Sequence, residues 1–173
     1  YENVEHTGNA FSTMNSGNAV YDQVAEMVHL NGGVKVHTVS QTRKTDLSGG
    51  SAIVALAVAA ENNREVKSAE VFREVVIDST QSADSSVSNI RSGYAFYEKP
   101  DRFVLREAVH IVSAGGENPT TLNAGQAVYE QDERTVDMTG GAEVTQGNNY
   151  TKGDSIFAEL YPTRTLKKAT VRG

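Results

Sequence analysis

Apolar and polar residues alternate along most of the chain, and the alternation is clearest between residues 123 and 147. Apolar side chains share one parity before an acidic turn at residues 131–134, and again after it. Because side chains two residues apart point to the same face of a strand, this pattern predicts two strands joined by a turn. The pair Gly140-Gly141 interrupts the second strand, which predicts a bend or bulge there.

The same pattern occurs elsewhere in the chain. Residues 16–38 and 92–113 repeat the order of a small residue, an aromatic residue two positions later, a polar turn and a second apolar run. A weaker copy spans residues 47–77, where the Ala-rich sequence also permits a helix over residues 54–72. Residues 1–14 and 153–173 read as partial units at the two ends.

The second strand of each copy has a central position that we call the crest. Repeats of this length indicate stacked supersecondary units that share one core. The long interval between the second and third crests predicts an insertion around residues 40–46, and the Ser-rich segment 78–89 predicts a long loop. The predicted crests are Gly8, Gly32, Arg73, Arg106, Gly140 and Gly173.

Each predicted strand has one apolar and one polar face, which is typical of an antiparallel sheet with a dry interior on one side. The sequence therefore predicts an all-β protein, with residues 1–173 forming a single domain of repeated hairpins. Such a stack leaves an unpaired strand edge at each end. We expect these edges to pair end to end with another β-protein by strand addition.

Composition removes several classes of function. The net charge of −6 provides no basic field for nucleic acid. The absence of cysteine excludes disulfides, thiolate metal sites and cysteine nucleophiles. The most apolar run, residues 52–60, is about half the ~18 residues of a membrane-spanning segment. Since the chain begins at Tyr1 and not at Met, we expect either that a targeting segment has been removed or that the chain is a fragment of a longer protein.

Candidate catalytic and metal-binding residues do not form a constellation. His29, His37 and His110 lie on the polar parity of predicted strands, so we expect single, solvated histidines. No carboxylate or second histidine falls at metal-ligand spacing, and no nucleophile, phosphate-loop or dinucleotide motif occurs. The sequence therefore predicts a protein that is not an enzyme and has no metal or cofactor.

The repeated phrase A-x-Y…L-x-G-G-x-V resembles that of the OstA-like lipopolysaccharide transport bridge family, which includes LptA, LptC and the periplasmic domain of LptD. The phrase is carried best by Ala127, Tyr129 and residues 138–144, 146–147 and 153–156. It is carried nearly as well by Ala19, Tyr21 and residues 30–36. The chain departs from the family pattern where Arg73-Glu74 and Arg106-Glu107 replace a Gly-Asn pair.

The resemblance implies an antiparallel, open, slightly twisted β-jellyroll in the periplasm, and therefore favours the removal of an export signal over a fragment. It implies partners of two kinds: lipopolysaccharide or a related glycolipid, whose acyl chains lie in the interior, and neighbouring bridge modules or further copies of this chain at the sheet edges. By the same resemblance, the lipid-facing positions are Tyr21, Leu30, Val34, Val36, Tyr97, Phe103, Leu105, Val109, Ile111, Val136, Met138, Ala142, Val144 and Ile156.

Two alternatives stay open at this point. The recurring tyrosines Tyr21, Tyr97 and Tyr129 are compatible with ordinary core packing as well as with the lining of a lipid groove. A structural or carbohydrate-binding β-solenoid of the cell envelope is the second candidate for the whole chain. A solenoid would show regular coils of about 20–25 residues, whereas the later repeats here are about 33 residues long and contain hairpin turns.

Overall fold

The computed structural model describes residues 2–7, 10–58, 64–81, 86–98, 102–114, 118–130, 132–162 and 166–173, and the side chains of these residues except 2–12 and 64–65. The regular elements in this part of the chain are strands. They are β1 (Glu2–Thr7), β2 (Ala10–Asp22), β3 (Met27–Val39), β4 (Arg43–Val58), β5 (Arg64–Gln81), β6 (Val87–Glu98), β7 (Arg102–Ala114), β8 (Thr120–Glu130), β9 (Thr135–Gln146), β10 (Asn149–Leu160) and β11 (Leu166–Arg172).

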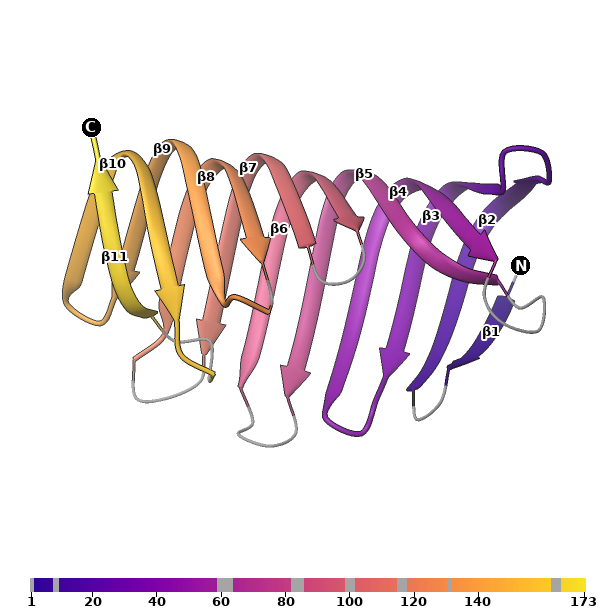
Figure 1. Ribbon diagram of the computed structural model, residues 1–173, viewed down its shortest axis with the longest axis horizontal. Coiled ribbons are helices and arrows are strands. Elements are labelled where there is room, and N and C mark those ends of the chain that lie inside the picture. The colour runs from indigo at the N-terminus through magenta and orange to yellow at the C-terminus, as the bar shows by residue number, and fades with distance from the viewer. Residues whose placement is uncertain are drawn as a thin grey trace.

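The strands form one 11-stranded sheet whose spatial order is the order of the chain, from β1 to β11. Every neighbouring pair is antiparallel. The two chain ends therefore lie at opposite ends of the long axis (Figure 1). This arrangement confirms the antiparallel open jellyroll. It contradicts the solenoid, because the successive coils of a solenoid stack their strands in parallel. It also contradicts the helix over residues 54–72, because the described residues of this range, 54–58 and 64–72, lie in β4 and β5.

Each strand from β2 to β10 bends across its middle, and the ribbons turn over along one edge of the molecule (Figure 1). On β3, β5, β7 and β9 the bend is made by two consecutive residues with positive φ, and the strand register shifts there. Such a two-residue bulge kinks the strand and lets both halves of the sheet face one interior. The pairs are Gly32-Gly33, Arg73-Glu74, Glu107-Ala108 and Gly140-Gly141.

Three of the predicted crests, Gly32, Arg73 and Gly140, are the first residues of these bulges. The crest predicted at Arg106 is wrong by one position, because positive φ begins at Glu107. Gly173, at the end of the chain, also has positive φ. The predicted crest at Gly8 lies outside the described residues.

A glycine on the preceding strand makes room for the bulge in two of the hairpins. A Cβ atom on Gly17 would lie 3.0 Å from the carbonyl oxygen of Gly32, and one on Gly125 would lie 3.2 Å from that of Gly140. These distances are too short for an unstrained side chain. The Gly that precedes the repeated small residue in both copies is therefore required by close approach of two backbones.

The structure corrects both predicted irregular segments. Residues 43–46 belong to β4. The longer interval between the second and third crests comes from the arms of the β4–β5 hairpin, which pair from Ser51 opposite Phe72 to Val58 opposite Arg64. Residues 78–81 and 87–89 are strand, and only residues 82–85 between them are undescribed. Two of the polar turns that the repeated pattern predicts, at residues 61–64 and 99–101, also lie outside the described residues, except for Arg64 at the start of β5.

The core is built from rows of inward side chains that cross the sheet. In one row, each side chain is the register partner of the next, and its central members are almost completely buried. This row consists of Ala19, Leu30, Ala52, Val71, Ala95, Leu105, Ala127, Met138, Ile156 and Val171. Small and large residues alternate along much of it, so neighbouring strands pack without steric conflict.

The Glu107-Ala108 bulge offers a direct test of backbone strain. Ala108 has φ 55° and an exposed side chain, so replacing it with Gly removes a Cβ from a left-handed position without removing buried contacts. We expect Ala108→Gly to raise the free energy of unfolding by about 0.5–1 kcal/mol, the relief of strain less the entropy that Gly adds to the unfolded chain. Urea denaturation measures the change.

The comparison is Ala124→Gly, at a buried position of β8 whose φ is not positive. This control should lower stability by at least about 0.5 kcal/mol. Equal losses in the two variants would show that the bulge at residues 107–108 carries no strain.

Candidate functional site

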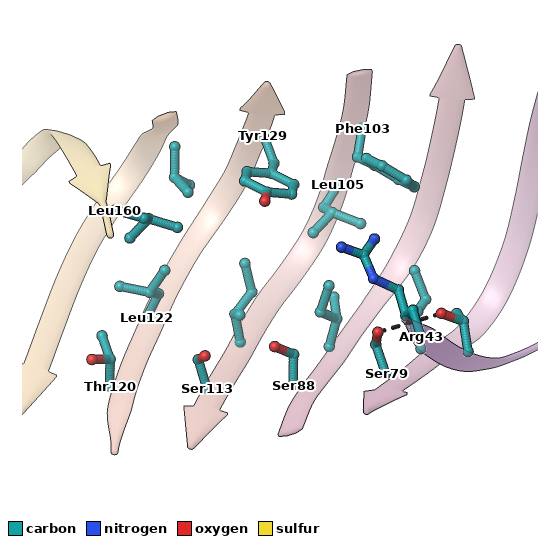
Figure 2. A pocket seen from close by; sticks show the side chains of 15 residues that line it. Arg43, Ser79, Ser88, Phe103, Leu105, Ser113, Thr120, Leu122, Tyr129 and Leu160 are labelled. Atoms are coloured by element: carbon teal, nitrogen blue, oxygen red, sulfur yellow. Dashed lines mark hydrogen bonds between the residues drawn. The ribbon is translucent and has the colours of Figure 1, made fainter. Parts of the chain in front are cut away.

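The bend divides the sheet into two walls that face each other across the interior. We call the arms that end at the β3–β4, β5–β6, β7–β8 and β9–β10 connections the first wall, and the opposite arms the second wall. Between them lies an open, mainly apolar cavity of about 120 Å³ (Figure 2). Fifteen residues line it: Arg43, Thr45, Ile77, Ser79, Ser88, Ile90, Phe103, Leu105, Ile111, Ser113, Thr120, Leu122, Tyr129, Val136 and Leu160.

A row of aliphatic side chains lines the cavity on the inner face of the first wall. Ile77, Ile90, Ile111 and Leu122 are successive register partners on β5, β6, β7 and β8. Strand alternation places all four on the inner face. This row gives the cavity a continuous hydrocarbon surface that crosses four strands.

An aromatic row faces it from the second wall. Tyr97, Phe103 and Tyr129 are register partners on β6, β7 and β8. The ring centroids of Tyr97 and Phe103 are 4.9 Å apart, and those of Phe103 and Tyr129 are 6.2 Å apart. Phe103 and Tyr129 line the cavity and are only partly buried, so the recurring aromatic position contributes to the cavity as well as to core packing.

A row of hydroxyl side chains lies beyond the aliphatic row on the first wall, and we call it the hydroxyl row. Its members are successive register partners on β4 to β8: Thr45, Ser79, Ser88, Ser113 and Thr120. All but Thr45 are buried. Thr45 Oγ1 donates a hydrogen bond to Ser79 Oγ at 3.3 Å. The alternation pattern does not reveal this row, because polar residues at the ends of predicted strands are expected in loops or on the solvent face.

The mouth of the cavity is polar. A second pocket of about 300 Å³ adjoins the first at Arg43, Tyr129 and Leu160. Its other lining residues come from both walls and include Gln81, Asp132, Arg134, Tyr161 and Pro162. The site therefore runs from a dry interior to a charged opening between the walls.

The interior of the sheet is largely filled by its own side chains. Leu105, Met138 and Ile156 are at most 1% exposed. The remaining cavity of about 120 Å³ is smaller than the ~150 Å³ engineered cavity that admits a benzene molecule. Full enclosure of a longer hydrocarbon chain therefore requires the walls to move apart.

Strand register places all fourteen residues predicted to face lipid on the inner face, but not at one place. Four of them line the cavity: Phe103, Leu105, Ile111 and Val136. Tyr21 is 44% exposed near the end of β2, where its hydroxyl donates to Glu26. The other nine, some fully and some partly buried, are Leu30, Val34, Val36, Tyr97, Val109, Met138, Ala142, Val144 and Ile156.

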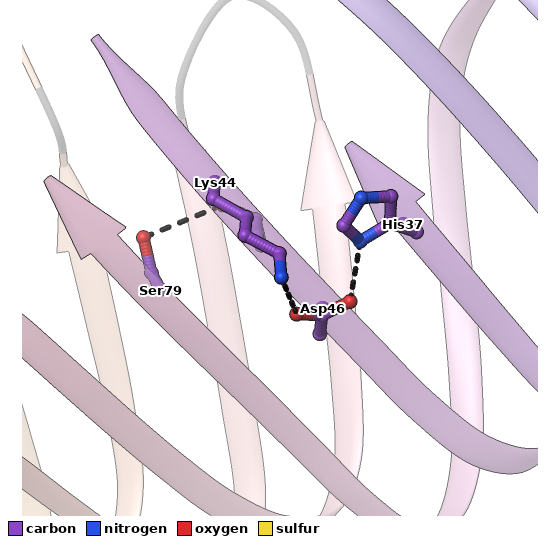
Figure 3. Close-up of polar contacts among 5 residues, drawn as sticks. His37, Lys44, Asp46 and Ser79 are labelled. Atoms are coloured by element: carbon purple, nitrogen blue, oxygen red, sulfur yellow. Dashed lines mark hydrogen bonds and ion pairs between the residues drawn. The ribbon is translucent and has the colours of Figure 1, made fainter. Parts of the chain in front are cut away.

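Two of the three histidines that were predicted to be single and solvated, His37 and His110, have side-chain partners on the outer face. His37 Nδ1 lies 2.6 Å from Asp46 Oδ1, with Lys44 Nζ 3.9 Å from the other carboxylate oxygen (Figure 3). His110 Nδ1 lies 2.6 Å from Asn123 Oδ1 on the neighbouring strand. Within the described residues, no group of three or more His, Asp or Glu side chains could hold a metal ion.

Other contacts of the outer face support the sheet. Lys152 Nζ donates to Glu143 Oε1 at 2.7 Å, and this hydrogen bond lowers the pKa of Glu143 and raises the pKa of Lys152. Burial and a hydrogen bond to Glu70 raise the pKa of Tyr94. These pairs join neighbouring strands, and none of them borders the cavity.

Comparison with known proteins identifies the fold. Neither the family models nor the curated proteins contain a match to this sequence. Among solved structures, the chain is similar to LptH of Pseudomonas aeruginosa, described as the LptA-homologous periplasmic component of the conserved lipopolysaccharide transport device. The TM-score is 0.59 at 13% sequence identity, over 94% of this chain and 95% of that one. In the described part of this chain, no helix is long and apolar enough to cross a membrane.

Proposed function

We propose that this chain is a non-enzymatic module of a periplasmic lipid bridge. It holds the acyl chains of lipopolysaccharide, or of a related glycolipid, between the two walls and passes them along the sheet towards the outer membrane. The observation that carries this proposal is the apolar cavity on the inner face of an open sheet, reached through a polar mouth. The likeness to LptH supports it at the level of the fold.

The cavity has the composition that hydrocarbon requires. Its first wall offers a continuous aliphatic row, and its second wall offers partly buried aromatic rings. Apolar surface of this kind gains free energy when an acyl chain displaces water from it. The charged side chains Arg43, Asp132 and Arg134 at the mouth suit the water-facing part of an amphiphile.

The two ends of the sheet suit the transfer of lipid between modules. β1 pairs only with β2, and β11 pairs only with β10, among the described strands. Each therefore has an unpaired edge to which another strand can add. We propose that the partners are neighbouring β-jellyroll proteins or further copies of this chain, joined so that their interiors form one continuous path.

Site-specific photo-crosslinking tests the proposed lipid path. A photoreactive residue in place of Phe103, which lines the cavity, is expected to give an adduct with labelled lipopolysaccharide in membranes. The matched control is Phe157, an aromatic residue of β10 that is 39% exposed and of the parity opposite to the inward Ile156. We expect at least about a tenfold lower adduct yield there, because the outer face offers no apolar enclosure.

Adducts of equal yield at Phe103 and Phe157 would indicate non-specific adsorption and contradict an internal path. The absence of an adduct at Phe103, and also at Leu160 on the same cavity, would contradict lipid transport by this chain.

A further inference from the structure

We propose that the hydroxyl row is a polar binding site between the two walls, which hydrogen-bonds the ester, amide or hydroxyl oxygens of an acyl ligand. The site deepens the proposed function and rests on it, because it assumes that an acyl chain enters the cavity. It assigns the ligand an orientation: the oxygen-bearing part lies against the first wall, and the hydrocarbon lies towards the aromatic row.

Two hydroxyl groups of this row are buried without a hydrogen-bond partner among the described residues. Thr120 is 1% exposed and Ser113 is 6% exposed. Neither Thr120 Oγ1 nor Ser113 Oγ has a hydrogen-bond partner among the described residues. A buried hydroxyl without a partner destabilises a folded protein, since it loses its hydrogen bonds to water and gains nothing in return. Two such groups side by side point to a ligand that supplies the missing partners.

The position of these groups supports the same conclusion. Ser113 and Thr120 are register partners on β7 and β8, and both line the apolar cavity. Their immediate inward neighbours are Ile111 and Leu122, so aliphatic side chains are accommodated on this face. A valine at position 120 would have nearly the same shape as threonine and would avoid the unpaired oxygen. The protein instead has hydroxyl groups at five consecutive strands.

The hydroxyl row also has the chemistry of the proposed ligand. A Ser or Thr hydroxyl both donates and accepts hydrogen bonds, so it can pair with a carbonyl oxygen or with a hydroxyl group. It carries no charge, and therefore favours neutral linkages over a free phosphate or carboxylate. In Figure 2 the side chains of Ser88, Ser113 and Thr120 lie at one end of the cavity, and Phe103 and Tyr129 lie at the other. One acyl group with its linkage matches this division.

Two fluorescent probes separate the polar site from the apolar cavity. Diphenylhexatriene is a pure hydrocarbon, whereas the methyl ester of parinaric acid is an acyl chain that ends in an ester. Both are titrated into the intact chain and into the double variant Ser113→Ala/Thr120→Val. We expect the double variant to bind the ester about tenfold more weakly, through the loss of two hydrogen bonds, and to bind the hydrocarbon within about twofold of the original chain.

The matched control is Thr121→Val, the next residue of β8, which points to the outer face. It should leave the binding of both probes within about twofold. A hydroxyl-retaining variant, Ser113→Thr, should preserve ester binding. The ligand-free double variant is expected to melt at the same temperature as the original chain or higher, because two unpaired buried hydroxyls have been removed.

The binding results test the hydroxyl row separately from the proposed binding of lipid in the cavity. If the original chain binds both probes and the double variant binds the ester equally well, the hydroxyl row is not a ligand site. A lowered melting temperature of the double variant would also count against it, since the hydroxyls would then be structural. If the original chain binds neither probe, the proposed lipid cavity itself is wrong.

Discussion

A cross-link between the two walls at the mouth of the cavity is expected to weaken the binding of an acyl chain by more than about tenfold. The cavity of about 120 Å³ can enclose only part of a long chain, so full enclosure requires the walls to separate. Gln81 and Tyr161 line the mouth from opposite walls, and the chain has no cysteine of its own. The variant Gln81→Cys/Tyr161→Cys can therefore be joined by a disulfide-containing bis-maleimide and titrated with a fluorescent acyl ester.

Reduction of the linker provides the internal control, because it releases the walls without removing the attached groups. Binding should then return to within about twofold of the unlinked variant. Each single-cysteine variant, capped with a simple maleimide, controls for bulk at the mouth. Unchanged binding in the linked form would mean that ligand enters by another route, such as the open ends of the sheet.

The replacement Met138→Ala is expected to lower the free energy of unfolding by about 3 kcal/mol. Met138 is 0% exposed and packs in the inward row between Ala127 on β8 and Ile156 on β10. Alanine removes most of this side chain and leaves a void that two flanking strands cannot fill without bending. Urea denaturation, followed by circular dichroism, measures the loss.

The adjacent residue supplies the comparison. Thr139→Ala changes an exposed side chain on the outer face of the same strand and should alter stability by no more than about 0.5 kcal/mol. If Met138→Ala costs less than about 1 kcal/mol, then the interior near β9 is loosely packed. The walls would in that case separate more easily than their burial suggests.

The strands and their inward faces could be predicted because apolar residues recur at every second position within each strand. Leu30, Val34 and Val136 have the burial that their parity indicates. The bulge at Glu107-Ala108 could be located only to within one position, since neither residue favours positive φ. Residues 54–58 and 64–72 have the composition of a helix, but hydrogen bonding to strands on both sides overrides that local preference.

The candidate site was less accessible to sequence reasoning than the core. Phe103 and Ile111 could be found because they belong to the repeated phrase and are apolar. Ile77 and Ile90 lie on either side of the Ser-rich segment that was predicted to be a loop, and so they were not grouped with Phe103 and Ile111. Ser113 and Thr120 are polar residues that face inward, and only the register between β7 and β8 reveals that they meet.

The strictly sequential strand order allows the molecule to grow by duplication of a hairpin in its gene. Each strand pairs only with its neighbours in the chain, so an additional hairpin could enter between β7 and β8 without breaking any distant pairing. Neighbouring strands lie about 4.8 Å apart, so each duplicated hairpin would lengthen the molecule by about 10 Å. Length in this architecture is therefore adjustable in fixed steps, and the distance that one copy spans is set by the number of hairpins it encodes.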